Sequence, residues 1–232
     1  MKEKFFRFLN AQWREWRGFI LLWAFVIIPV KSSLADWNWV PSGSMNPTIL
    51  EGDLVYVNKL AYDLRFPLTR HSLNHLGDPE RGDISVLLSP EDEKRLVKRV
   101  IGIPGDTVEM RDYMLYINDE RLDYTELPEE ERAGLMAELT RISAFAQEDL
   151  DGRPHAMMVT PAISMARSFP EITVPDGHYF VMGDNRDNSK DSRAFGFVER
   201  SRFLGEATSV VVSFDMLDKY QPRIGRFFTS LD

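Results

Sequence analysis

A serine capable of nucleophilic chemistry lies in a short turn between two prolines, in the segment PSGSMNP at residues 41–47. An exposed hydroxyl on a constrained turn can attack a carbonyl once a base activates it, and we assign this role to Ser44. Gly43 permits close backbone approach, so the Ser44 N–H and the Ser42 hydroxyl could both face a developing oxyanion. Because Ser-Gly-Ser between prolines is more often an ordinary turn, the assignment requires a base elsewhere in the chain.

The candidate base is Lys98, in the segment RLVKRVI at residues 95–101, whose pattern predicts a strand. Strand alternation places Lys98 on one face with Leu96 and Val100, and Arg99 on the other. Burial against apolar side chains disfavours the ammonium form and lowers the pKa of a lysine, which makes a neutral amine available. The alternative is a solvated lysine on an edge strand.

A polar loop, GDNRDNSKDSR at residues 183–193, is the third candidate element. Its Asp, Asn and Ser residues favour Asx turns and salt bridges, so it could be only an elaborate surface turn. As a functional element it could supply the Ser189 hydroxyl to orient the lysine amine, with Asp191 and Arg193 bracing the loop. Its acidic spacing does not fit an EF-hand calcium loop.

Composition excludes several other kinds of site. The absence of cysteine excludes a thiol nucleophile, a disulfide framework and thiolate metal ligands. The formal net charge of −8 argues against a nucleic-acid partner. His71 and His75 have the spacing of a helical metal-binding pair, but no Glu or third ligand follows in the required pattern, so we expect them in an exposed loop. We predict no metal and no organic cofactor.

An uncharged apolar stretch at residues 18–30 precedes these elements, and its extension to residue 35 admits only Lys31, which could snorkel. Pro29 would kink or end a helix here. Trp37 and Trp39 follow at a depth where indole rings favour the membrane interface. The same stretch, with Ser33-Leu34-Ala35 at its end, also fits a cleavable signal peptide.

The balance of positive charge around this stretch predicts its orientation. Basic residues before the stretch outnumber the single one after it, and they are Lys2, Lys4, Arg7, Arg14 and Arg17. The positive-inside rule therefore places the amino terminus in the cytoplasm and everything after the span outside.

The rest of the chain predicts a mainly β fold, barrel-like or sandwich-like, with a smaller inserted α/β lobe and one preceding transmembrane helix. Short alternating or apolar segments bounded by turn residues predict strands at 54–60, 83–88, 95–101, 114–117, 121–124, 172–174, 178–182 and 208–214. From Pro128 to about Leu150, apolar residues recur at helical spacing after an acidic first turn, which predicts an amphipathic helix.

These patterns divide the chain into successive parts. We expect a cytoplasmic amino terminus at 1–17, a transmembrane anchor at 18–35, and a catalytic core in two parts, 36–110 and 171–232. Between the two parts of the core we expect an inserted, partly helical lobe at 111–170.

Five blocks of the sequence, in order, resemble bacterial type I signal peptidases. They are PSGSM at 41–45, GDLVYVNK at 52–59, RGD at 81–83, KRVIGIPGD at 98–106 and GDNRDNSKDSR at 183–193, followed by GF at 196–197. The resemblance implies that Ser44 is the nucleophile and Lys98 the general base.

The same resemblance implies supporting and substrate-binding roles. Ser42 would complete the oxyanion hole, Ser189 would hydrogen-bond the lysine, and Asp191 and Arg193 would hold the site together. By the same analogy, residues lining shallow pockets for small side chains at positions −1 and −3 of the signal peptide would include Val40, Pro41 and Met45.

The activity implied is that of a membrane-anchored serine endopeptidase that removes signal peptides from exported preproteins through an acyl-enzyme. Its partners would be these preproteins and the lipid bilayer, and we expect a monomer. It would lie in the bacterial inner membrane as a single-pass protein with its catalytic domain on the outer, periplasmic side. Many Gram-negative members have two amino-terminal spans, whereas this sequence shows one.

Three other hypotheses use some of the same features. A self-cleaving LexA-type repressor would need a DNA-binding helix-turn-helix and a soluble amino terminus, and neither is evident. A dedicated maturation peptidase of a conjugation or secretion system would use the same dyad on one substrate. An inactive membrane-tethered binding module would retain the fold and leave a preprotein whole.

Overall fold

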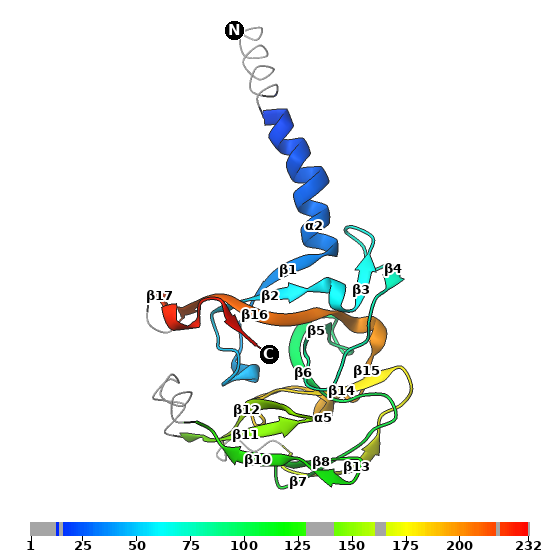
Figure 1. The fold of residues 1–232 in the computed structure, drawn as a ribbon, viewed down its shortest axis with the longest axis vertical. Coiled ribbons are helices and arrows are strands. Elements are labelled where there is room, and N and C mark those ends of the chain that lie inside the picture. The colour runs from blue at the N-terminus through cyan, green and yellow to red at the C-terminus, as the bar shows by residue number, and fades with distance from the viewer. Residues whose placement is uncertain (1–12, 14–15, 129–141, 161–165, 217–218, 232) are drawn as a thin grey trace.

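The computed structural model describes residues 13, 16–128, 142–160, 166–216 and 219–231. A large antiparallel sheet with the strand order β1-β2-β16-β5-β6-β14-β15 forms the centre of the described chain, and β17 and β18 both pair with β16 (Figure 1). Its strands are β1 (Ala35–Trp39), β2 (Asp53–Asn58), β5 (Ile84–Leu88), β6 (Arg95–Gly102), β14 (His178–Met182), β15 (Val198–Glu199), β16 (Phe203–Asp215), β17 (Gln221–Pro222) and β18 (Thr229–Ser230).

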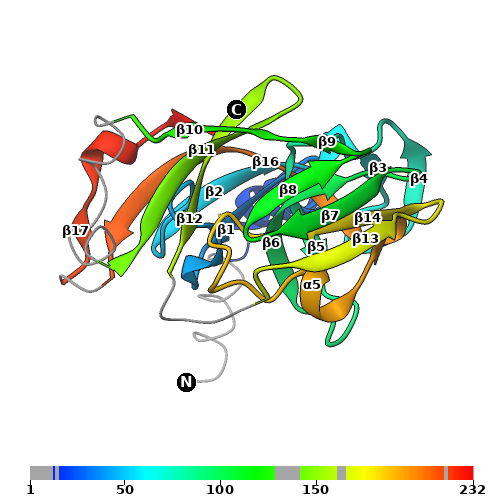
Figure 2. The same ribbon diagram turned by 90° about the horizontal axis from the view of Figure 1, so that it is seen from below.

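Three smaller antiparallel sheets accompany the large one. Two of them lie on the side of the domain away from the amino-terminal helix, and Figure 2 shows them from below. They consist of β10 (Asp123–Glu126), β11 (Ala144–Leu150) and β12 (Arg153–Val159), and of β7 (Thr107–Arg111), β8 (Met114–Ile117), β9 (Glu120–Arg121) and β13 (Phe169–Thr173). The third is the hairpin of β3 (Asp63–Arg65) and β4 (Ser72–His75).

A helix precedes the sheets and projects away from them (Figure 1). Its described part, Trp16–Ser33, is long and apolar enough to cross a membrane, with a mean hydropathy of 1.3. It includes a π-helical segment, Trp23–Ile27, directly before α2 (Ile28–Ser33), whose first turn contains Pro29. A proline cannot donate to the preceding turn, so a change of helical bonding at this point has a local cause. The helix ends at Ser33, and Ala35 already belongs to β1.

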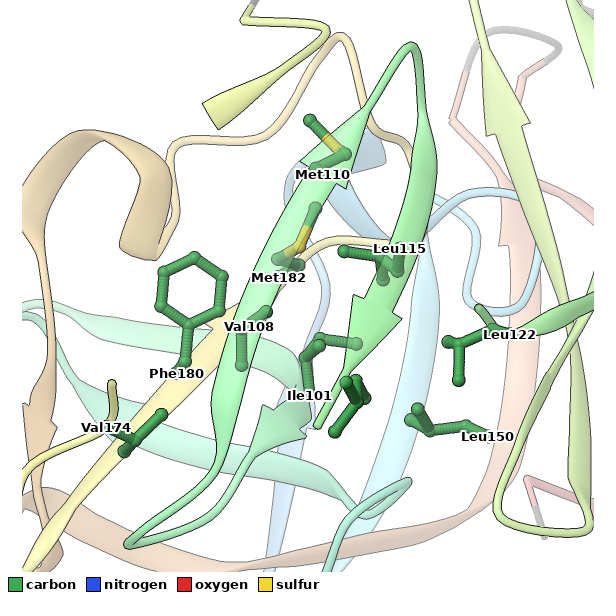
Figure 3. Close-up of a cluster of buried hydrophobic side chains, with 10 residues drawn as sticks. Ile101, Val108, Met110, Leu115, Leu122, Leu150, Val174, Phe180 and Met182 are labelled. Atoms are coloured by element: carbon green, nitrogen blue, oxygen red, sulfur yellow. The ribbon is translucent and has the colours of Figure 1, made fainter. Parts of the chain in front are cut away.

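Strand β6 lies between two hydrophobic clusters because its alternate side chains point to opposite faces. Ile101 joins a cluster with residues of β7, β8 and β14, and Val100 joins a second cluster around Tyr179 and Phe203. Figure 3 shows the first cluster, in which Phe180 and Met182 of β14 pack with the β7–β8 hairpin. Both faces of the second half of β6 are therefore buried.

Each segment predicted as a strand overlaps at least one, although 121–124 spans the end of β9 and the start of β10, and the mainly β fold is confirmed. The residues between the two strands β8 and β9, Asn118 and Asp119, both have positive φ, as a tight hairpin turn requires. The predicted helix from Pro128 to Leu150 is wrong over its last seven residues, which form β11; residues 129–141 lie outside the described residues. The helical spacing was misleading there because Leu150 packs into the core as part of a strand.

Candidate active site

Ser44 lies in a short 3-10 turn, Gly43–Met45, that follows β1. The turn is anchored to the core, because Met45 and Ile49 are buried in a cluster with Val55 and Val86 of the large sheet. The Ser44 side chain itself is only half-buried. The sequence therefore places a reachable hydroxyl on a backbone that the core fixes.

The Lys98 amine lies directly beside this hydroxyl. Its Nζ is 2.7 Å from Ser44 Oγ, and it also donates to the Val97 carbonyl at 2.9 Å. Lys98 is only 3% exposed, as the strand alternation predicted. The pKa of Lys98 is lowered to about 8, chiefly by burial of the amine. The negative charges of Asp191 and Asp184 raise this pKa, and the positive charge of Arg193 lowers it.

The polar loop after β14 holds the backbone of the serine turn. Strand β14 pairs with β6 so that Met182 lies opposite Arg99, and the loop consequently begins next to Lys98. The Asn185 N–H donates to the Ser44 carbonyl at 3.2 Å, and the Asn185 side-chain amide donates to the Gly43 carbonyl at 3.0 Å. A Cβ added to Gly183 would lie 2.3 Å from the Ser44 carbonyl oxygen, so this contact requires glycine.

Asp191 and Arg193 form a buried ion pair within this loop. The Arg193 guanidinium donates twice to the Asp191 carboxylate, at 2.9 and 2.8 Å, and the Gly183 N–H donates to it at 3.0 Å. Asp191 also caps the short helix α5 (Ser192–Phe195) by accepting from the Arg193 N–H. Although burial raises the pKa of Asp191, the hydrogen bonds and charge of Arg193 hold that pKa below its ordinary value.

Ser189 differs from the prediction. Its hydroxyl is buried and lies near the Asp191 carboxylate, whose pKa it helps to lower, and the Lys98 amine donates to Ser44 and Val97 instead. Ser189 is nevertheless close by, since a Cβ on Gly183 would lie 2.3 Å from both Ser189 Oγ and the Ser44 carbonyl oxygen. The expected hydrogen bond between Ser189 and Lys98 is therefore not formed in this structure.

The residues expected to contact substrate lie in three different surroundings. Ser42 is exposed and extended, and its hydroxyl makes no capping bond to the turn. Val40 and Pro41 line an apolar pocket of about 420 Å³ together with Trp39, Phe214 and Tyr220. Met45 does not line this pocket, because it is 1% exposed and packs in the core under the serine turn.

A buried ion pair beside the dyad was missed at the sequence level. Arg99 donates to both carboxylate oxygens of Asp184, at 2.9 and 2.8 Å, and both side chains are buried. The hydroxyl of Thr48, three residues after the turn Gly43–Met45, donates to the same carboxylate at 2.6 Å. The signal available was an arginine in an apolar strand, which needs a buried acidic partner.

A second buried pair connects the loop to the β11–β12 hairpin. Arg186 and Glu148 are both fully buried, and their side chains form two hydrogen bonds. His155 on β12 lies 3.3 Å from Glu148 and 4.0 Å from Asp184. Nothing in the sequence pointed to Glu148, because its segment was interpreted as a helix.

Metal-ligating side chains are not gathered at this site. Within residues 13, 16–128, 142–160, 166–216 and 219–231, no group of three or more His, Asp or Glu side chains could hold a metal ion. His71 and His75 are exposed, and His75 ends strand β4.

Comparison with known proteins gives consistent similarities. A family described as "Signal peptidase, peptidase S26" matches residues 13–212. Signal peptidase I of Pseudomonas aeruginosa is 36% identical over 203 residues, which cover 82% of this chain and 69% of the relative. Signal peptidase I of Rickettsia bellii is 34% identical over 214 residues, covering 84% and 71% respectively.

A solved structure, the crystal structure of a signal peptidase I from Enterococcus faecalis V583, is 37% identical and covers 56% of this chain and 97% of that chain. The TM-score of this comparison is 0.36. The mainly β architecture rests on the strands described above.

Proposed function

Since the chain belongs to the signal peptidase I family, peptidase S26, and is a serine hydrolase that removes signal peptides, we propose that Ser44 and Lys98 are its catalytic dyad. The observation that supports this most is the 2.7 Å separation between Lys98 Nζ and Ser44 Oγ. At this separation a neutral amine can accept the serine proton directly.

The reaction begins when uncharged Lys98 takes the proton from Ser44 as its Oγ attacks the scissile carbonyl. The protonated amine then gives that proton to the leaving amino group of the mature protein, and an acyl-enzyme remains. A water that gives a proton to Lys98 attacks the acyl carbonyl, and Lys98 returns this proton to Ser44 Oγ as the acyl bond breaks and the signal peptide leaves. The lowered pKa of Lys98, about 8, supports both steps because the amine can exchange a proton near neutral pH.

The oxyanion forms next to the serine turn, where the Ser44 N–H and the Ser42 hydroxyl stabilise it. The absence of a capping bond from Ser42 supports this, because its hydroxyl is not committed to the turn. The substrate's extended segment pairs beside β1, which is the terminal strand in the order of the large sheet and leads into the serine turn. Val40 and Pro41 contribute to the pockets for small side chains, and Met45 supports them from the core.

Asp191 and Arg193 act as positioning residues, since they fix Gly183 against the serine carbonyl. Ser189 is adjacent to the same carbonyl, and it reaches the amine of Lys98 by a change of rotamer during the reaction. Ser44, Lys98 and the polar loop all come from one chain, which supports action as a monomer.

The catalytic core is formed by residues 36–110 and 171–232, and residues 111–170 are the inserted lobe. Residues 18–35 anchor the protein in the bacterial inner membrane as a single span, with residues 1–17 in the cytoplasm and the catalytic domain on the periplasmic side. The length and hydropathy of the helix Trp16–Ser33 and the basic residues before it support this arrangement.

The test is cleavage of a purified preprotein by the full chain in detergent micelles. Ser44→Ala and Lys98→Met each lower kcat/KM by at least about 10⁴-fold, since removal of a nucleophile or its base costs this much in serine proteases. Methionine is chosen at position 98 because it fills the buried space without a charge. Lys94→Ala, whose side chain is 78% exposed, serves as the matched control and retains activity.

The fold of each variant is checked by its thermal unfolding midpoint. Normal processing by the Ser44→Ala or Lys98→Met variant would discard the dyad. A wild-type protein that binds the preprotein and leaves it whole would instead indicate a binding module.

A further inference from the structure

A second pocket, of about 610 Å³, lies at the foot of the amino-terminal helix. It is enclosed by the end of α2, the β3–β4 hairpin and the beginnings of β1 and β6. The cationic side chains that line it are Lys31, Lys59, Arg65, Arg70 and Arg95. The only carboxylates among its described lining residues are Asp36 and Glu93, so the pocket is positively charged in a chain whose net charge is −8.

The carboxylates near these cations are all shared. Asp63, which does not line the pocket, lies 3.1 Å from Arg65 and 3.2 Å from Arg200. Asp36 lies 3.1 Å from Arg95, 3.4 Å from Lys59 and 4.0 Å from Lys31. Glu93 pairs with Arg70 and also with Arg202, each at 2.6 Å. One carboxylate cannot neutralise two or three cations, and an excess of positive charge therefore remains in the pocket.

The pocket is a built feature of the helix end. The Lys59 ammonium, 12% exposed, donates to the carbonyls of Lys31 and Ser32 at 3.0 Å each, and this holds its charge at the helix terminus. The Arg65 side chain lines the pocket and is 7% exposed. One of its terminal nitrogens donates to Asp63 and to the Phe203 carbonyl, whereas its Nε has no hydrogen-bond partner in the described chain.

The rim of the pocket is apolar on the side of the helix. The Leu68 N–H donates to Ser32 Oγ at 2.7 Å, so the loop between β3 and β4 is tied to the helix end. Leu68 and Phe66 on this loop are 77% and 54% exposed. Figure 1 shows the loop rising beside the lower end of α2. With the helix in a bilayer, the rim lies at the depth where acyl chains meet headgroups.

We propose that this pocket binds the phosphate of an anionic phospholipid headgroup, with an acyl chain lying against Leu68 and Phe66. Lysine and arginine side chains bind phosphate oxygens by charge-assisted hydrogen bonds, and basic side chains next to a span attract anionic lipids. A free phosphate ion has the same headgroup chemistry but would gain nothing from the apolar rim. The proposal rests on the helix being in a membrane and is independent of the catalytic assignment.

The test measures lipid binding to the full chain in a neutral detergent by native mass spectrometry. Short-chain phosphatidylglycerol, phosphatidylcholine and inorganic phosphate are the three probes. The variant Arg70→Gln/Arg95→Gln removes two exposed cations of the pocket, and Arg111→Gln/Arg121→Gln removes two exposed arginines of the β7–β9 region as a matched control. Arg70→Lys/Arg95→Lys retains the charges and detects any loss due to misfolding.

Phosphatidylglycerol is expected to bind the wild type, the lysine variant and the control with similar Kd. It binds the Arg70→Gln/Arg95→Gln variant roughly 25-fold more weakly, which corresponds to about fivefold for each cation removed. Phosphatidylcholine binds the wild type at least about tenfold more weakly than phosphatidylglycerol does.

Equal binding of the two lipids, or unchanged binding by the glutamine variant, would overturn the proposal. Displacement of phosphatidylglycerol by millimolar inorganic phosphate would show that the pocket binds a soluble anion, and would overturn the proposal that its ligand is a lipid. Cleavage of a soluble peptide substrate in neutral detergent is unchanged in the glutamine variant, so a failed dyad and a failed lipid site give different results.

Discussion

The substitution Asp191→Asn separates the two effects that we assign to this carboxylate, support of the loop and an electric field on the base. The Asp191 and Arg193 side chains are 0% and 2% exposed. Asparagine keeps the size of the side chain and removes its charge, which leaves the Arg193 guanidinium buried without a counter-ion. Removal of one partner from a buried ion pair costs about 3–5 kcal/mol of folding free energy.

The same substitution lowers the stability of the protein but makes the neutral form of Lys98 available at lower pH. The charge of Asp191 raises the pKa of Lys98, and the charge of Arg193 lowers it. Without the carboxylate, the pKa of Lys98 falls below its value of about 8. The neutral amine is then available at lower pH, so the acid limb of the kcat/KM profile moves to lower pH although the protein is less stable.

The assay combines urea unfolding, followed by tryptophan fluorescence, with the pH dependence of peptide cleavage. The double variant Asp191→Asn/Arg193→Gln has no unpaired charge, so its loss of stability is smaller than the sum of the two single losses. Asp92→Asn, at an exposed surface pair with Lys94, is the control and changes neither measurement. A loss below about 1 kcal/mol in Asp191→Asn, or an acid limb that moves to higher pH, would refute the reasoning.

Three further predictions concern the same residues. For the wild type, kcat/KM rises about tenfold per pH unit below pH 8 and levels off above it, as the pKa of Lys98 of about 8 requires; a profile that is flat from pH 6 to 9 would contradict a lysine base. Gly183→Ala abolishes cleavage in the peptide assay, because its Cβ would lie 2.3 Å from the Ser44 carbonyl oxygen, whereas Gly225→Ala, with nothing within 4 Å, leaves activity intact. The pKa values of Asp184 and Asp191 are held low by Arg99 and Arg193, so their stabilisation is present above the unfolded-state pKa of about 3.9 and is lost as pH falls through the lower folded-state values. Urea unfolding should therefore show a loss of stability below about pH 4, and equal stability at pH 3 and pH 6 would contradict these ion pairs.

The separate roles of Ser44 and Lys98 were predictable because each residue has a local signal in the sequence. A turn between prolines exposes a hydroxyl, and alternation in RLVKRVI points Lys98 towards the interior. Their proximity was not local, and it came from the resemblance of five blocks to one family. The bracing pair of Asp191 and Arg193 is separated by one residue, so its contact also lay within reach of the sequence.

The buried polar network around the dyad was not predictable from local patterns. Arg186 contacts Glu148 across 38 residues, and Arg99 contacts Asp184 across 85. Helical spacing from Pro128 onwards concealed β11, and Glu148 on that strand therefore had no assigned partner. Which carboxylate satisfies which arginine depends on how the lobe packs on the loop, and hydrophobic periodicity contains no information about that.

The most direct test of the central claim is the titration of Lys98 itself. The full chain is labelled with ¹³C at the lysine Cε, and the Lys98 signal is assigned by its loss in Lys98→Met. Its chemical shift is then followed from pH 6 to 11 by NMR. A midpoint near 8 is predicted from the burial of the amine beside Ser44. A midpoint near 10.5, the ordinary value for lysine, would contradict the account.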